Sequence, residues 1–187
     1  MTGLSKFKTT MKSYNMSSRS STISNAFAQA LAPSDVFDVA QLEKVFHELN
    51  LYDENGVLLC TYCSAKSSSV DHLNPLVHKS KFTGWGHVFG NLVPACADCN
   101  QKKGGKPWRD FAKNICLPQE QIARLERYEL SAPEPVSQDD LAIFYPDLLD
   151  AYQRLRELSI DTLKAAQSIA NEIRRLEENR KSSQAIS

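Results

Sequence analysis

"VPACADCNQKKGGK", residues 93–106, places two cysteines three positions apart and follows them with an asparagine and a run of lysines. The same spacing occurs earlier in the chain, so Cys60 and Cys63 form one CxxC pair and Cys96 and Cys99 form a second. Two such pairs can present four thiolates in a tetrahedron, which is the arrangement of structural Zn²⁺ sites. We therefore predict a structural zinc ion bound by these four cysteines.

The cellular compartment that the sequence indicates also favours metal binding over disulfide formation. No apolar run approaches the ~20 residues that span a bilayer, and the chain begins without a compact apolar signal segment. We expect a soluble cytoplasmic protein with no membrane partner, in which cysteines stay reduced. Cys116 has no partner at metal-ligand spacing, and we expect it to be a small buried hydrophobic residue.

Charge is unevenly distributed along a chain that is neutral overall. The 187 residues contain 22 Lys plus Arg and 22 Asp plus Glu. Residues 57–116 hold eight basic residues against three acidic ones, whereas residues 117–187 hold nine basic against thirteen acidic ones. The cysteine-rich block is thus the basic one, as in a polyanion-binding site that lies beside an acidic tail.

The chain before the cysteine block predicts an arm, a helix and a turn. Residues 1–33 are basic and rich in Ser and Thr, and they predict a flexible arm. Residues 34–50 predict a helix capped by Ser34, because apolar residues recur there at helical spacing. Asn55-Gly56 predicts the tip of a hairpin that leads into the first CxxC pair.

The chain after the cysteine block predicts further helices. Short helices are expected over residues 107–115 and 118–130, followed by a proline-containing linker over residues 131–140. Residues 141–187 are expected to hold a long helix, from about Pro146 to Lys181, and a tail.

The long helix carries apolar and small residues on one stripe: Leu148, Tyr152, Leu155, Ala166, Ile169, Ile173 and Leu176. Ser159 and Thr162 fall at would-be core positions, which argues against a continuous two-stranded coiled coil. The stripe could pack against its own domain, pair with a second copy as a homodimer, or bind a larger protein partner. We expect it to mediate protein contacts, because its acidic surface is ill suited to DNA.

The 32 residues between the two CxxC pairs contain polar groups suited to catalysis. Asp71-His72 stands in a DHxxP motif, and Asn91 and Asn100 stand in an NLxxxCxxCN motif. This ordered set resembles the HNH endonuclease family, also called His-Me finger or ββα-metal nucleases, in the branch with a CxxC pair on each side of the finger. The resemblance covers about residues 57–110.

The resemblance implies an α+β fold, with a small zinc-stabilised ββα-metal finger flanked by N- and C-terminal helices and a nuclease domain over residues 34–130. It implies a metal-dependent endonuclease that hydrolyses DNA phosphodiester bonds. His72 would be the general base, and Asp71 and Asn100 would hold a catalytic Mg²⁺ or Mn²⁺ ion. Asn91 would brace the loop that carries the base.

The basic residues after the second CxxC pair are expected to bind DNA. Lys102, Lys103 and Lys106 flank the expected site, and the two glycines before Lys106 allow the backbone to approach phosphate closely. Lys103 matches the lysine that the family places after its CN dipeptide. His78 and His87 lie within the insert, and we expect a structural or solvent-exposed role for each.

Two function classes agree with these motifs. The first is a DNA endonuclease, acting alone or as a subunit of a restriction or anti-phage defence assembly. The second is a catalytically inactive, zinc-stabilised module that binds DNA or serves as a scaffold. The presence of all four motif residues, Asp71, His72, Asn91 and Asn100, favours the enzyme.

Overall fold

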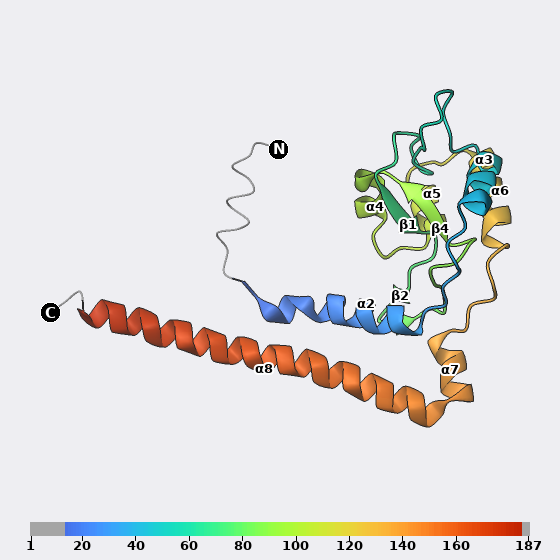
Figure 1. Ribbon diagram of the computed structural model, residues 1–187. Coiled ribbons are helices and arrows are strands. Elements are labelled where there is room, and N and C mark those ends of the chain that lie inside the picture. The colour runs from blue at the N-terminus through green and yellow to red at the C-terminus, as the bar shows by residue number, and fades with distance from the viewer. Residues whose placement is uncertain (1–13, 185–187) are drawn as a thin grey trace. The chain divides into compact units, whose positions relative to one another are not determined.

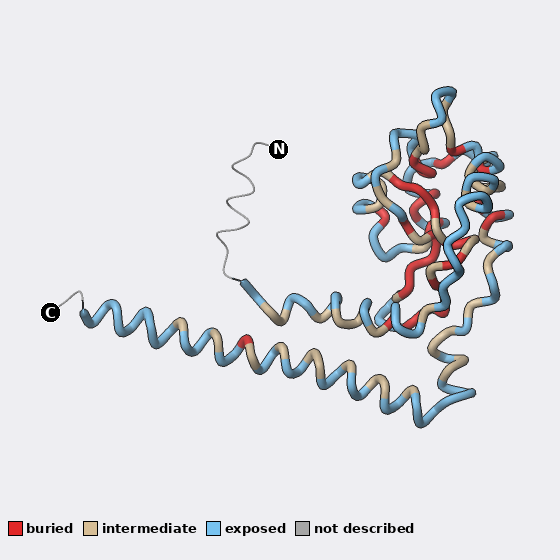
Figure 2. The backbone as a smooth tube through the Cα atoms, viewed as in Figure 1, coloured by how far each residue is buried: buried red, intermediate tan, exposed pale blue. Residues whose placement is uncertain are grey.

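The computed structural model describes residues 14–184, which divide into two compact units (Figure 1). The helical unit comprises Met1–Ala26 and Asp147–Ser187, and the finger unit comprises Phe27–Pro146. Buried residues are concentrated in the finger unit, whereas the helical unit is mostly exposed (Figure 2). Among the described residues, no helix is both long enough and apolar enough to cross a bilayer.

The N-terminal region differs from the flexible arm that the sequence predicts over residues 1–33. A short 3-10 helix, η1, covers Met16–Arg19, and α2 covers Ser20–Leu31. The α2 segment is rich in alanine and has Ile23 and Leu31 on one face, so it can form an amphipathic helix. Its high serine content hid this helical spacing of apolar residues. The first thirteen residues of the expected arm lie outside the described residues.

Helix α8 covers Pro146–Gln184 as one element of 39 residues, which confirms the predicted long helix. The side chain of Gln167 is buried, and its Oε1 accepts a hydrogen bond from the backbone N–H of Met16 at 2.6 Å. The hydroxyls of Ser159 and Thr162 donate to carbonyls one turn earlier on the same helix. The apolar stripe is more than half exposed at five of its positions: Leu148, Leu155, Ile169, Ile173 and Leu176.

The finger unit is an α+β assembly built around two small antiparallel sheets. Strand β1 pairs with β4 so that Ser69 lies opposite Ala95 and His72 opposite Leu92, and β2 pairs with β3. Helix α4 follows β4 directly, so β1, β4 and α4 form the expected ββα finger. The elements of the unit are α3 (Val39–Glu48), β1 (Ser69–His72), β2 (Val77–His78), β3 (Lys81–Phe82), β4 (Leu92–Ala95), α4 (Ala97–Lys103), α5 (Trp108–Asn114), α6 (Gln119–Glu129) and α7 (Gln138–Phe144).

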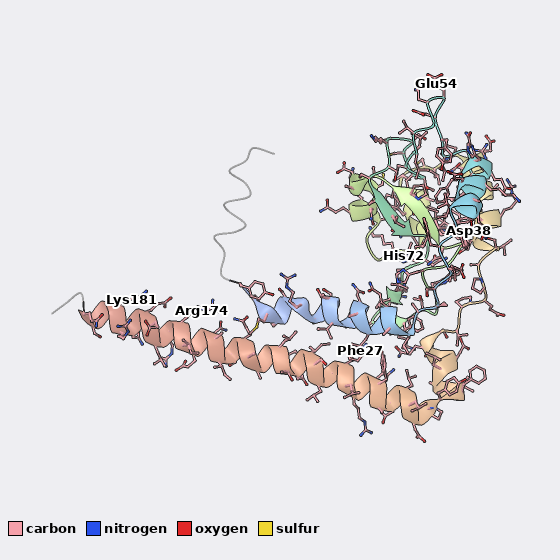
Figure 3. The ribbon with its side chains drawn as sticks, viewed as in Figure 1. Phe27, Asp38, Glu54, His72, Arg174 and Lys181 are labelled. Carbon is pink, nitrogen blue, oxygen red and sulfur yellow. The ribbon has the colours of Figure 1, made fainter. Side chains whose placement is uncertain are left out.

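Helix α3 begins five residues later than the cap predicted at Ser34. Asp38 is the N-cap, and its carboxylate accepts the backbone N–H of Gln41 at 3.1 Å (Figure 3). Ser34 instead forms a parallel bridge with His87, so its backbone is engaged in strand-like pairing rather than in a helix start. The predicted cap at Ser34 is therefore wrong, and the helix is capped four residues later, at Asp38.

The predicted hairpin before the first CxxC pair is reduced to a turn. Gly56 has a φ of +73°, and its N–H donates to the carbonyl of Asp53 at 3.1 Å. Glu54 lies at the tip of this turn (Figure 3). An isolated bridge between Tyr52 and Leu58 joins the two arms, together with backbone hydrogen bonds from Asp53 N–H to the Val57 carbonyl and from Leu59 N–H to the Leu51 carbonyl.

The core of the finger unit lies where α5 and α6 pack on the finger. Trp108 and Leu125 are fully buried. The backbone N–H of Trp108 donates a hydrogen bond to the carbonyl of Leu73 at 2.8 Å. Cys116 is exposed, which corrects the expectation that it is buried. It occupies a turn with a φ of +52° after α5, and the next residue, Leu117, enters the core in its place.

The segment predicted as a linker over residues 131–140 packs closely on the finger. A Cβ added to Gly84 would lie 2.5 Å from the backbone carbon of Val136, and one added to Gly90 would lie 2.5 Å from the backbone nitrogen of Ala132. The last residues of the segment belong to α7, which starts with a capping box between Ser137 and Asp140. The segment is thus a packed strap over two glycines.

We predict that Gly90→Ala destabilises the finger unit more than Gly56→Ala does. Both glycines have a positive φ, so both variants carry the backbone cost of about 1–3 kcal/mol for a non-glycine residue in this region. Only at Gly90 does the added methyl group also meet the strap, because nothing lies within 4 Å at Gly56. Urea unfolding of the two variants measures the difference, and equal midpoints would mean that the strap does not rest on Gly90.

Candidate functional site

The four predicted zinc ligands meet in space. The sulfur atoms of Cys60, Cys63, Cys96 and Cys99 all lie within 4.8 Å of one another. The distance from Cys63 Sγ to Cys96 Sγ is 3.7 Å, close to the edge of about 3.8 Å for a tetrahedron with zinc–sulfur bonds of about 2.3 Å. This separation is far longer than the ~2.05 Å of a disulfide. The donor set therefore fits a structural Zn²⁺ ion.

The local chemistry of the cluster also favours metal binding. Cys96 is the N-cap of α4, and its sulfur accepts the backbone N–H of Cys99 at 3.4 Å. This hydrogen bond lowers the pKa of Cys96 to about 7, which favours the thiolate that zinc requires. Burial raises the pKa of Cys60, so a charged sulfur there needs a neighbouring cation.

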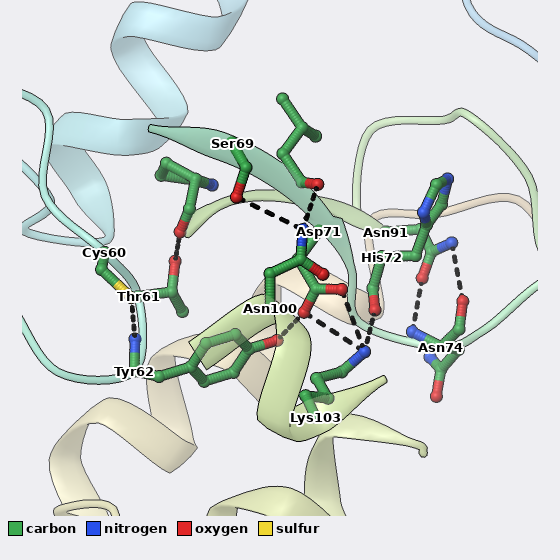
Figure 4. Close-up of polar contacts among 12 residues, drawn as sticks. Cys60, Thr61, Tyr62, Ser69, Asp71, His72, Asn74, Asn91, Asn100 and Lys103 are labelled. Atoms are coloured by element: carbon green, nitrogen blue, oxygen red, sulfur yellow. Dashed lines mark hydrogen bonds and ion pairs between the residues drawn. The ribbon is translucent and has the colours of Figure 1, made fainter. Parts of the chain in front are cut away.

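Asp71 lies in β1 with its side chain turned into the protein. Tyr62 donates its hydroxyl to Asp71 Oδ2 at 2.7 Å, and Lys103 Nζ donates to Asp71 Oδ1 at 3.2 Å (Figure 4). The lysine ammonium also donates to the backbone carbonyl of His72. Asp71 and Lys103 are buried, at 5% and 1% exposure. The pair is a buried ion pair that joins β1 to the end of α4.

This position of Lys103 differs from the phosphate contact that the sequence suggested. Burial lowers the pKa of its ammonium, and the carboxylate of Asp71 opposes that shift. The exposed lysines of the cluster are Lys102, which lies 3.7 Å from Asp98, and Lys106. Only these two of the three predicted lysines lie where a polyanion can reach them.

Asp71 and Asn100 as they stand do not form an open site for a catalytic divalent ion. A dication at the Asp71 carboxylate would lie beside the ammonium of Lys103, which repels it. Asn100 Nδ2 donates to Ser69 Oγ at 3.3 Å and to the carbonyl of Val70 at 3.2 Å, near the start of β1. Successive strand residues point to opposite faces, so Asp71 turns inward while His72 turns away from it.

His72, at the end of β1, contacts a second histidine. Its Nε2 lies 3.0 Å from His87 Nδ1, and the two rings meet edge to face with centroids 5.0 Å apart. Burial, together with the neighbouring His87, lowers the pKa of His72 to about 4. The imidazole of His72 is therefore neutral near pH 7 and has a lone pair that can accept a proton. The sequence favoured a structural or exposed role for His87 over a contact with phosphate or with the metal.

Asn91 is fully buried between the segments that carry these two histidines. Its Oδ1 accepts the backbone N–H of Asn74 at 2.8 Å, and its Nδ2 donates to the carbonyls of Asn74 at 3.2 Å and Gly86 at 2.9 Å (Figure 4). One amide side chain thus joins the backbone two residues after His72 to the backbone just before His87.

Two members of the site, Tyr62 and His87, were not assigned to it from the sequence. Tyr62 stands between the two cysteines of the first pair, so its nearness to the metal cluster could have been predicted from the sequence. His87 lies in a loop fifteen residues from His72, where no periodic pattern indicates contact. Only the folded chain brings the two rings together.

Comparison with known proteins gives one match, to a family model that covers part of the chain. Residues 60–106 match the family model of the HNH endonuclease, from the first zinc ligand to the end of the lysine cluster. No curated protein and no solved structure matches the chain.

We predict that Cys96→Ser removes zinc and unfolds the finger. Zinc binding in small zinc peptides supplies on the order of 10–16 kcal/mol, and strands of two to four residues cannot replace that contribution. Elemental analysis and near-ultraviolet circular dichroism should show one zinc ion per chain in the wild type and neither zinc nor ordered aromatic signal in the variant. Cys116→Ser, which changes an exposed thiol outside the cluster, is the matched control and should retain both.

We also predict that Lys103→Met costs about 3–5 kcal/mol of unfolding free energy, because it leaves the buried Asp71 carboxylate without its cation. Lys102→Met, on the same helix but exposed, should change stability by less than about 0.5 kcal/mol. Urea titrations in the presence of zinc measure both. Equal effects would show that Lys103 is solvated in solution.

Proposed function

Because residues 60–106 form an HNH endonuclease segment, we propose that this protein is an endonuclease that hydrolyses DNA phosphodiester bonds. The observation that carries the proposal is the neutral, half-buried imidazole of His72 at the end of a strand in a zinc-braced ββα finger. The exposed lysines on and after α4 support binding of a polyanion beside it.

In the proposed reaction, the imidazole of His72 takes a proton from the attacking water. The water oxygen bonds to phosphorus as the bond from phosphorus to the 3′ oxygen breaks, and the 3′ oxygen takes a proton from solvent to leave as a hydroxyl. Proton transfer by a positioned base contributes about 10²–10⁴ in rate. The lysines hold the backbone of the nucleic acid, and they do not read its sequence.

The side chains expected to bind a catalytic Mg²⁺ or Mn²⁺ ion, Asp71 and Asn100, already have other partners. Such an ion would supply charge stabilisation at the phosphate. Asp71 is engaged by Lys103 and Tyr62, so it does not offer an open carboxylate. The cleavage assay therefore compares Mg²⁺, Mn²⁺ and EDTA.

The occupied Asp71 carboxylate favours a second candidate function, which is a zinc-stabilised module that binds DNA without cutting it. The two candidates differ in one measurement. The endonuclease converts supercoiled plasmid to open-circular or linear DNA, whereas the binding module only retards the plasmid in a gel.

We predict that His72→Ala reduces plasmid cleavage by about 10²–10⁴-fold while zinc content and DNA binding are kept. The control is His78→Ala, which removes a half-buried histidine of β2 that lies outside the site. Wild-type turnover in the His72 variant would refute its role as base. A wild-type protein that binds plasmid but never cuts it, with either ion, would establish the second candidate.

We further propose that α8 pairs with α8 of a second copy. Four of its exposed apolar residues, Leu148, Leu155, Ile169 and Leu176, share a row with seven-residue spacing that Thr162 interrupts. Leu158 and Ile173 are exposed apolar residues beside that row. Heptad spacing suits helix pairing, and a second copy presents the same row in return. The helix is long enough for five heptads, about 58 Å at 1.5 Å per residue.

We predict that Ile169→Glu converts a dimer to a monomer, because it places a charge in the middle of the apolar row. Lys164→Glu changes the charge of an exposed residue outside the row and should leave the mass unchanged. Light scattering on the eluting protein measures mass per particle. A wild-type protein with the mass of one chain would refute self-pairing.

A further inference from the structure

The contact between His72 and His87 leaves one nitrogen of His72 available. Nε2 of His72 faces His87 Nδ1 at 3.0 Å, so this nitrogen is occupied. No group within residues 14–184 bonds to Nδ1 of His72. The buried, unpaired side-chain nitrogens of that part of the chain are Trp108 Nε1 and Arg156 Nε, so His72 Nδ1 is open to solvent.

His87 is held in place through its backbone. Its N–H donates to the carbonyl of Pro33 at 2.8 Å, and its carbonyl accepts the N–H of Asp35 at 3.1 Å. Next to it, Gly86 lies so close to Pro33 that an added Cβ would approach the Pro33 carbonyl oxygen to 2.0 Å. Asn91 holds the carbonyl of Gly86 from the other side. These restraints fix the backbone from which the His87 ring projects toward His72.

We propose that His87 is a positioning residue for His72: its Nδ1 accepts a hydrogen bond from Nε2–H of His72 and fixes the ring and tautomer of the base. This inference rests on the proposed endonuclease function. In this tautomer His72 Nδ1 carries the lone pair and points to solvent, where the attacking water can lie.

The opposite sharing of the proton conflicts with catalysis. If His87 donated from Nδ1, the lone pair of His72 would sit on Nε2, and its open Nδ1 would carry a hydrogen and could not act as a base. In the proposed arrangement the water proton passes to His72 Nδ1. The resulting imidazolium keeps Nε2–H bonded to His87, which stabilises its charge, and the Nδ1 proton then leaves to solvent.

The atom that makes the contact defines the test. Asparagine places a carbonyl oxygen at the same distance from Cβ as Nδ1 of histidine, whereas glutamine places its polar atoms nearer the Nε2 position. We therefore expect His87→Asn to keep kcat within about tenfold of wild type, and His87→Ala and His87→Gln to lose about 10–100-fold with KM unchanged. His78→Ala is the control for loss of a histidine in the same insert.

Two results would overturn the inference from kinetics. One is wild-type kcat in both His87→Ala and His87→Gln. The other is an equal loss in His87→Asn and His87→Ala, since that pattern reports a steric role. Thermal unfolding of each variant identifies any loss that comes from misfolding.

A second measurement does not need catalysis. Long-range ¹H–¹⁵N NMR spectra of the zinc-loaded protein distinguish the two neutral tautomers of each imidazole. We expect His72 in the Nε2–H form in the wild type and in His87→Asn, and in a mixture of forms in His87→Ala. His72 in the Nδ1–H form would overturn the inference, whereas a wild-type protein that cuts no plasmid but has the expected tautomer would overturn only the proposed function.

Discussion

The convergence of four sulfur atoms at one point is the constraint on which the finger depends. Cys60 and Cys63 precede β1, and Cys96 and Cys99 lie where β4 meets α4, so a metal ion bound there would join the start of the ββα unit to this junction. The strands have only two to four residues, and few backbone hydrogen bonds hold them. A zinc ion would supply the rigidity that apolar burial supplies in a larger sheet, and it would fix the positions of His72 and α4.

Much of the helical framework could be predicted from the sequence, because caps and apolar periods are local signals. Helices α5 and α6 follow prolines, and α8 begins with Pro146, close to their expected bounds. The predicted start of α3 was wrong, because Asp38 and not Ser34 caps the helix, and both residue types are favourable caps. Local signals also failed in α2, where serine-rich composition outweighed a helical period.

The sequence predicts which residues belong to the candidate site, but it does not predict the contacts of their side chains. Asp71 and His72 are adjacent in sequence, yet a strand turns neighbouring side chains to opposite faces, so the two make different contacts. Lys103 belongs to a run of lysines that resembles a solvated surface, and only the buried carboxylate of Asp71 explains why it turns inward. The meeting of the four cysteines was predictable, because two CxxC pairs are typical of a tetrahedral metal site.

The pairing of residues 33–35 with the backbone of His87 limits how far this domain can be truncated. A fragment limited to residues 60–106 would keep the zinc ligands and His72 but would lose the carbonyl of Pro33 that holds His87. It would also lose Ala132 and Val136, which cover two glycines of the same loop. The region that matches the HNH model is thus smaller than the stretch of chain that packs on the His87 loop, which extends from Pro33 to Val136.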